Sequence, residues 1–167
     1  MKDFLKYFTI IFVLFFSTAS AQIKDCSTVD DASRIIIAGG SITEIIYFIG
    51  VEDNIIGLDV TSVYPEQTKE FPSIGYVRNL SAEGVLSMNP SLVLGEDDMG
   101  PPAVIKQIMK TSVDLRIIPE QHNADGIIKK INCIGKIINQ EEVVSKTIKK
   151  KIMPTVKQLK KISAKNT

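Results

Sequence analysis

The chain has 167 residues, with 20 Lys or Arg and 19 Asp or Glu, so its formal net charge is +1. This length suits one domain of ordinary size and excludes two large ones. A near-neutral charge gives no electrostatic basis for nucleic-acid binding, which depends on many phosphate contacts. We therefore expect no nucleic-acid partner.

The first segment, 1–21, has the pattern of a secretory signal peptide. Lys2 and Lys6 form a basic start, an apolar run follows over 7–16, and small residues lead to Ala21. The apolar run is shorter than the ~20 residues that span a bilayer, which argues against a membrane anchor. We expect cleavage after about Ala21, a periplasmic mature protein and no stable membrane insertion.

The mature sequence begins with an N-terminal extension over 22–33 and then alternates β-rich runs with helical patterns. Unbroken apolar runs predict buried parallel strands at 34–38, 54–58, 91–94 and 113–118. Turn and capping signals predict helices at 41–49, 65–71, 81–88, 101–111 and 124–139. The order predicts a single three-layer α/β lobe over 34–140, with helices on both faces of a mainly parallel sheet.

Local motifs indicate where several helices begin and end. Ser41 to Glu44 form a capping-box pattern, which predicts Ser41 as an N-cap, and Gly50 is expected to close that helix. Ser81 is the expected N-cap of a later helix. Pro101-Pro102 suits the first turn of another helix, because proline fixes a helical φ.

The segment over 141–167 predicts the start of a long helix with an apolar stripe. The stripe comprises Val144, Ile148, Ile152, Val156, Leu159 and Ile162. Pro154 interrupts it and predicts a kink or a division of the helix. The many lysines after Glu142 are interpreted as a solvated face. Part of the stripe is expected to lack a partner to pack against.

The mature chain contains Cys26 and Cys133. Export permits a disulfide between them, whereas burial of Cys133 in a helix would serve equally well as a small apolar side chain. Both alternatives stay open, and neither cysteine has metal-site spacing.

Motifs for enzymatic chemistry are weak. Gly39-Gly40 joins a strand to a helix, and Asp59 follows about twenty residues later, as in dinucleotide sites. The remaining glycines of that fingerprint are missing, so a small nucleotide-using α/β enzyme is a disfavoured alternative. Glu96, Asp97 and Asp98 cluster after a strand, and His122 lies in a polar loop. One His supports no catalytic triad, and we expect no enzyme.

Several blocks occur together in one order. They are Ala38 to Glu44, Thr61 to Pro65, Gly75-Tyr76-Val77-Arg78, Leu80 to Gly84, Asn89 to Leu94 and Gly100 to Ala103. From Ile35 onward the chain resembles the haem-binding periplasmic binding proteins of ABC importers for metal chelates. The resemblance implies an extracytoplasmic, non-enzymatic carrier that delivers haem to a membrane permease and its ATPase.

The resemblance also implies site residues. The Tyr of the Gly-Tyr-x-Arg block ligates haem iron in that family, which maps to Tyr76; ferric iron accepts a phenolate oxygen. Arg78 would support the phenolate or meet a haem propionate. Tyr64 and the segment Gly100, Pro101 and Pro102 would line the cleft. Glu83 matches a position that docks on the permease, where charge complementarity sets the register.

This sequence departs from the family because complete members have two lobes joined by a long helix. Only the first lobe and the start of that helix are recognised here, which puts tight haem retention in doubt. Another chelate, such as cobalamin or a ferric siderophore, is the nearest alternative ligand. A truncated or non-functional remnant is a third interpretation.

Overall fold

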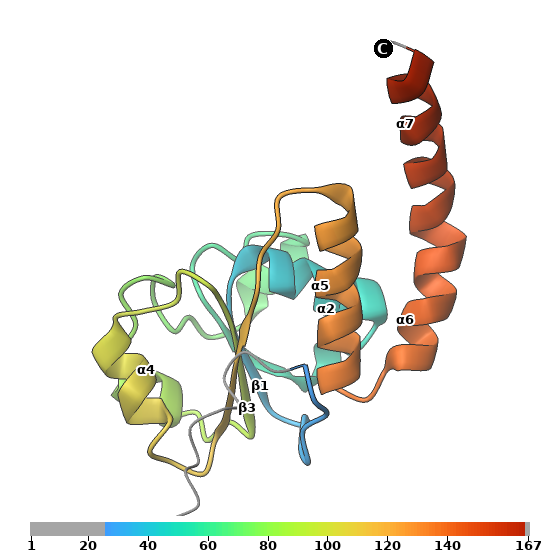
Figure 1. The fold of residues 1–167 in the computed structure, drawn as a ribbon. Coiled ribbons are helices and arrows are strands. Elements are labelled where there is room, and N and C mark those ends of the chain that lie inside the picture. Colours follow the sequence, from blue (N-terminus) through green and yellow to red (C-terminus); the bar gives the residue numbers. More distant parts are fainter. Residues whose placement is uncertain (1–25, 166–167) are drawn as a thin grey trace, which may run out of the picture.

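Four parallel strands form the centre of the lobe, in the order β2-β1-β3-β4. The strands are β1 (Ile35–Ala38), β2 (Ile55–Leu58), β3 (Leu92–Glu96) and β4 (Asp114–Ile118). The computed structural model describes residues 26–165, and Figure 1 shows them as a lobe that continues into a long helical segment. The predicted strands and the α/β class are confirmed.

Helices cover both faces of the sheet because the apolar strands bury side chains on both sides. In β1, Ile35 and Ile37 lie in one core, whereas Ile36 and Ala38 lie in another. The first core packs against α2 (Gly40–Ile49) and α5 (Ala124–Ile137), and the second against α3 (Ala82–Leu86) and α4 (Pro102–Ile108). Figure 1 shows α2 and α5 on one side of the sheet and α4 on the other.

The expected caps are confirmed at three helix ends and wrong at one. The Ser81 hydroxyl accepts a hydrogen bond from the Gly84 amide, and Gly50 closes α2 in the left-handed region with φ 86°. Pro102 occupies the first turn of α4. The Ser41 capping box does not form, because the N-cap of α2 is Gly39, two residues before Ser41, and Ser41 lies inside the helix. The Ser41 hydroxyl is instead engaged by buried charges.

Two short 3₁₀ helices border β2. These are η2 (Glu52–Asn54), before the strand, and η3 (Glu66–Glu70), where a short helix is expected over 65–71.

The C-terminal segment stays helical but is divided next to Pro154. It consists of α6 (Glu141–Thr147), a π-helical turn η4 (Ile148–Ile152) and α7 (Met153–Lys165). Proline has no N–H for the carbonyl four residues earlier and its ring crowds that carbonyl, so a widened turn before Pro154 accommodates it. The expected irregularity is therefore present as a π turn.

The apolar stripe of this segment is buried only at its start. Val144 and Ile148 lie in the core with α2 and α5, whereas Leu159 and Ile162 are 58% and 50% exposed. Figure 1 shows α7 extending away from the sheet. The expectation that part of the stripe lacks a partner is confirmed for the described residues. In the same part of the chain, no helix combines the length and apolar character needed to cross a membrane.

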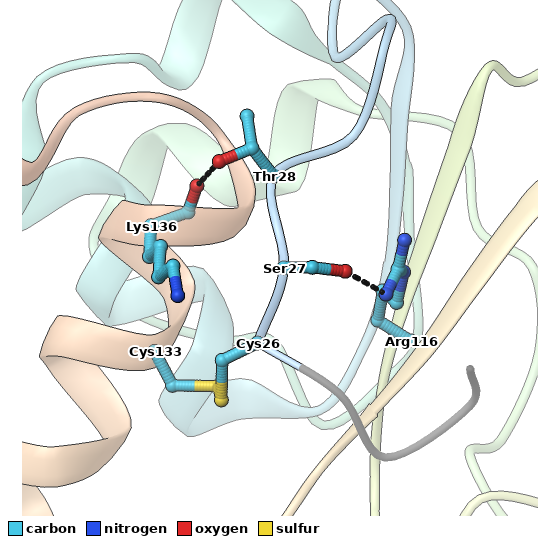
Figure 2. The surroundings of a disulfide bond; sticks show 6 residues. All are labelled: Cys26, Ser27, Thr28, Arg116, Cys133 and Lys136. Carbon is cyan, nitrogen blue, oxygen red and sulfur yellow. Dashed lines mark hydrogen bonds between the residues drawn. A yellow bond between two sulfur atoms is a disulfide. The ribbon is translucent and has the colours of Figure 1, made fainter. Parts of the chain in front are cut away.

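Cys26 and Cys133 form a disulfide, which settles the question left open by the sequence. The bond ties the N-terminal segment to α5, and the Thr28 hydroxyl also donates to the Lys136 carbonyl of that helix at 3.0 Å (Figure 2). On its other side the segment reaches β4, where buried Arg116 donates to the Ser27 hydroxyl at 3.1 Å (Figure 2). The expected signal peptide, 1–21, lies outside the described residues.

Candidate functional site

The carboxyl ends of the parallel strands meet at one edge of the sheet. The chain goes from β1 outward to β2 and then crosses to β3 on the other side of β1. In doubly wound sheets, ligands bind at the carboxyl edge where the strand order reverses in this way. The loops that follow β1, β2 and β3 therefore frame the candidate site.

The turn that carries Tyr76 is fixed on both sides by backbone hydrogen bonds. The Val60 amide donates to the Gly75 carbonyl, and the Gly100 amide donates to the Val77 carbonyl, both at 2.9 Å. Within the turn, the Asn79 amide donates to the Tyr76 carbonyl at 2.8 Å. The Val77 side chain is buried in the core with α3 and α4. Tyr76 thus stands on a turn held to the loops that follow β2 and β3.

Asp59 organises the loop after β2 from within. Its buried carboxylate accepts hydrogen bonds from the Gly39 amide and the Ser62 hydroxyl, both at 3.0 Å. It also accepts from the amide and the hydroxyl of Thr61, at 2.9 and 2.7 Å. A buried carboxylate needs such donors. Asp59 is therefore a structural residue that joins the first βα turn to the loop carrying Tyr64.

Large apolar and aromatic side chains are exposed on these anchored loops. Tyr76 is 44% exposed and Tyr64 is 66% exposed, and Val60 and Val63 are also exposed. Exposed apolar side chains on a rigid edge are typical of a surface that receives a ligand. The arrangement offers apolar contacts together with phenol oxygens.

Arg78 follows Tyr76 by two residues and pairs with Asp98. Its Nε and Nη2 atoms lie 2.8 and 2.7 Å from the same carboxylate oxygen, Oδ2 of Asp98. The hydrogen bond to Asp98 raises the pKa of the guanidinium, and the Tyr76 phenol and the Asp98 charge act in the same direction. Arg78 therefore stays a cation beside Tyr76, with a carboxylate as its neighbour.

The run Glu96, Asp97 and Asp98 does not converge on one point. Glu96 accepts from Ser41 at 2.5 Å, Asp97 accepts from the Glu120 amide at 3.0 Å, and Asp98 holds Arg78. Among the described residues, no group of His, Cys, Asp and Glu side chains could hold a metal ion. Each acid instead fixes a different element at the edge of the site.

A buried ionic cluster, which the sequence did not reveal, lies at the same edge. Lys130 of α5 is 7% exposed, and its Nζ atom lies 2.5 Å from the Ser41 hydroxyl. Its other partners are the carboxylates of Glu96 and Glu120, at 3.3 and 3.2 Å. The available signal was the position of Lys130 four residues before Ile134, on the face of the helix that points to the core.

Glu96 of this cluster packs against the Gly39 turn, which a nucleotide phosphate would have to approach. A β-carbon on Gly39, which has φ 149°, would clash with Cγ of Glu96. Since the acidic side chain packs against this turn, a pyrophosphate at the start of α2 would meet a negative charge. The geometry favours a tight structural turn over the nucleotide-binding alternative.

The remaining sequence-predicted residues lie around this edge. Gly100 is buried and its carbonyl accepts from the Leu80 amide at 2.9 Å, next to the Tyr76 turn. Pro101 and Pro102 lead into α4. Glu83 is exposed in the first turn of α3, and His122 is exposed in the loop before α5. The structure thus brings Tyr76, Arg78 and Gly100 together and places Glu83 on a separate helix.

A protein-family model described as periplasmic binding protein matches residues 35–162. Among curated proteins, an uncharacterized ABC transporter substrate-binding lipoprotein, YvrC of Bacillus subtilis, is 28% identical over 135 residues, which are 73% of this chain and 43% of the relative. A vitamin B12-binding protein of Vibrio campbellii is 24% identical, over 69% of this chain and 42% of its own length.

Solved structures give a consistent comparison. The periplasmic heme-binding protein RhuT from Roseiflexus sp. RS-1 has 38% identity and a TM-score of 0.66, over 70% of this chain and 44% of that chain. The heme-binding protein HutB of Vibrio cholerae has 32% identity and a TM-score of 0.65, over 70% and 45%. The chain therefore spans less than half the length of these relatives.

Proposed function

The chain belongs to the periplasmic binding protein family, and from this premise we propose that it captures haem outside the cytoplasm for an ABC importer. The family and the substrate-binding relative YvrC favour an extracytoplasmic binding role. The disulfide agrees with an oxidising compartment, where such bonds persist. In this proposal the chain binds and delivers its ligand without catalysing a reaction.

The observation that carries the haem proposal is the exposed Tyr76 on its anchored turn with Arg78 beside it. A phenolate oxygen is a suitable ligand for ferric iron in haem. The neighbouring guanidinium can receive a haem propionate. The exposed Val60, Val63 and Tyr64 side chains would contact the apolar macrocycle.

Substitution at Tyr76 tests the iron ligand. Mature protein is titrated with ferric haemin, and the tyrosinate-type absorption spectrum is recorded for the wild type, Tyr76→Phe and Tyr47→Phe. We expect the spectrum to disappear in Tyr76→Phe, because the phenyl ring has no oxygen to bind iron. Tyr47→Phe is the matched control because Tyr47 lies on α2, outside the candidate site. An unchanged spectrum in Tyr76→Phe would overturn the assignment.

Cobalamin is a second candidate ligand because vitamin B12-binding proteins are among the relatives. Parallel titrations with haemin and cyanocobalamin distinguish the two ligands. Tighter binding of haemin would support the proposal, whereas tighter binding of cyanocobalamin would replace it.

We further propose that Glu83 docks on the permease. Glu83 is exposed on α3, and a carboxylate there can pair with a basic side chain of the membrane partner. In cells that carry the native importer, Glu83→Lys is expected to abolish haem uptake and to leave haemin binding by the purified protein unchanged. Normal uptake by this variant would contradict the docking role.

The division into a lobe over 34–140 and a linking helix over 141–167 remains a prediction. If the helix leads to a second lobe, that lobe would cover the other face of the ligand, and the exposed Leu159 and Ile162 would gain partners.

A further inference from the structure

Asp98 lies at the candidate site, and the family resemblance implies no role for this residue. It lies in the loop between β3 and α4, two residues before Gly100. That loop is tied to the Tyr76 turn at two points, since the Gly100 amide donates to Val77 and the Leu80 amide donates to Gly100. The backbone that carries Asp98 is therefore fixed relative to the backbone that carries Arg78.

The pair between Asp98 and Arg78 is partly open to ligands. The Nε and Nη2 atoms of the guanidinium both contact Oδ2 of Asp98, and the side chains of Arg78 and Asp98 are 63% and 40% exposed. An arginine has five N–H donors, so the contacts to Asp98 leave donors for a second acceptor. The Asp98 carboxylate at the same time cancels much of the positive charge that an approaching anion would experience.

We propose that Asp98 is a specificity-determining residue that positions Arg78 and competes with the carboxylates of the ligand. This inference rests on the proposed function, because it concerns a macrocycle bound at Tyr76. Ligand carboxylates must share the guanidinium with Asp98 or displace it. Removing the charge of Asp98 while keeping its acceptor oxygen should therefore favour carboxylate-bearing ligands selectively.

The competing view gives Asp98 a purely structural role. An exposed ion pair contributes little to stability, and Asp98 lies outside both cores. If Asp98 served only to hold the loop, its substitution would change the binding of every macrocycle by a similar factor. The acid-to-ester affinity ratio separates the two views because only the competing role depends on the ligand charge.

The test uses metal-free protoporphyrin IX, which carries two carboxylates, and its dimethyl ester, which carries none. Binding is followed by quenching of porphyrin fluorescence for the wild type, Asp98→Asn and the control Asp53→Asn. Asp53 is exposed in η2, which precedes β2 and therefore lies away from the carboxyl edge. We expect Asp98→Asn to bind the acid about 5 to 10 times more tightly and the ester unchanged, the scale of one modified charge contact.

Each result decides between the interpretations. The role of Asp98 would be overturned if Asp98→Asn left the acid-to-ester affinity ratio unchanged or bound the acid more weakly. The proposed function would stay intact in both cases. A similar gain in Asp53→Asn would attribute the effect to net charge and would also overturn it. If the wild type bound none of the three ligands (protoporphyrin IX, its dimethyl ester and haemin), both the proposed function and this inference would be overturned.

Discussion

Lys130 and Arg78 both face carboxylates at the carboxyl edge of the sheet, but their surroundings differ. Lys130 is 7% exposed and lies between Glu96 and Glu120, whereas Arg78 is 63% exposed and pairs with Asp98. Burial makes the first cation part of the structure, because an unpaired charge there would be costly. Exposure leaves the second available for exchange with a ligand. Under our proposal, a paired cation thus serves the fold in one place and ligand recognition in the other.

The largest effect is expected for Lys130→Met. This change leaves Glu96 and Glu120 without their buried counter-charge, and breaking such a group typically costs about 3 to 5 kcal/mol. The free energy of unfolding is measured by urea titration followed by circular dichroism. Lys129→Met, on the exposed neighbour, should stay within about 0.5 kcal/mol of the wild type. If both substitutions lowered the free energy of unfolding equally, the buried Lys130 would contribute no more to stability than the exposed Lys129, and the contrast drawn above would fail.

Loss of the disulfide should have the next largest effect. Cys133 lies on α5, the helix that also carries Lys130, and the disulfide joins this helix to the N-terminal segment. Removing the disulfide therefore shows how much the N-terminal segment stabilises the helix that carries the ionic cluster. The variant Cys26→Ser with Cys133→Ser is expected to lose about 2 to 4 kcal/mol, because the cross-link restricts the unfolded chain. Urea unfolding of the variant and of the wild type in a reducing dithiol should agree. A loss confined to the reduced wild type would contradict this account.

Arg78→Gln should leave the stability almost unchanged. Exposed ion pairs contribute about 0 to 1 kcal/mol, so we expect a loss of at most that size in urea unfolding. Haemin binding by the same variant should weaken about tenfold, as one charge-assisted contact is lost. A large loss of stability would place Arg78 with Lys130 among the structural cations.

The smallest effect is expected at the Tyr47 phenol. Lys130 is buried beside carboxylates of opposite charge, whereas the carboxylates near Tyr47 disfavour its charged form. Burial raises the pKa of the Tyr47 phenol, and the charges of Glu52 and Glu70 raise it further. The folded state therefore holds this proton more tightly than the unfolded state, whose pKa is about 10. The stability that the protonated Tyr47 phenol contributes is fully present below the pKa of the unfolded state. It is lost as the pH rises through the pKa of the folded state. Urea unfolding should show a steeper alkaline decline for the wild type than for Tyr47→Phe.

The sequence predicted the elements whose signals are local. The strand at Ile35–Ala38 was evident because both of its faces are buried, and Ser81 caps a helix with an amide three residues away. Ser41 has a similar local motif, but its partners, Glu96 and Lys130, are 55 and 89 residues distant. Tertiary contacts therefore overrode the capping box.

The same reason limits what the sequence could say about the site. Three adjacent acids suggested a cluster, yet Glu96, Asp97 and Asp98 turn to different partners. The Cys26–Cys133 pairing was undecided, because a separation of 107 residues carries no geometric information. The role of Tyr76 came from resemblance alone, and the structure adds its anchored turn and its neighbours.

If Tyr76 binds haem as proposed, the anchoring of its turn has a consequence for the kinetics of capture. Because Val60 and Gly100 already hold the turn, an arriving ligand finds the site in place and no loop ordering has to precede contact. Encounter rates should then vary little among substitutions at the rim. Differences in affinity should appear as differences in residence time, the quantity that determines how long a carrier keeps its cargo.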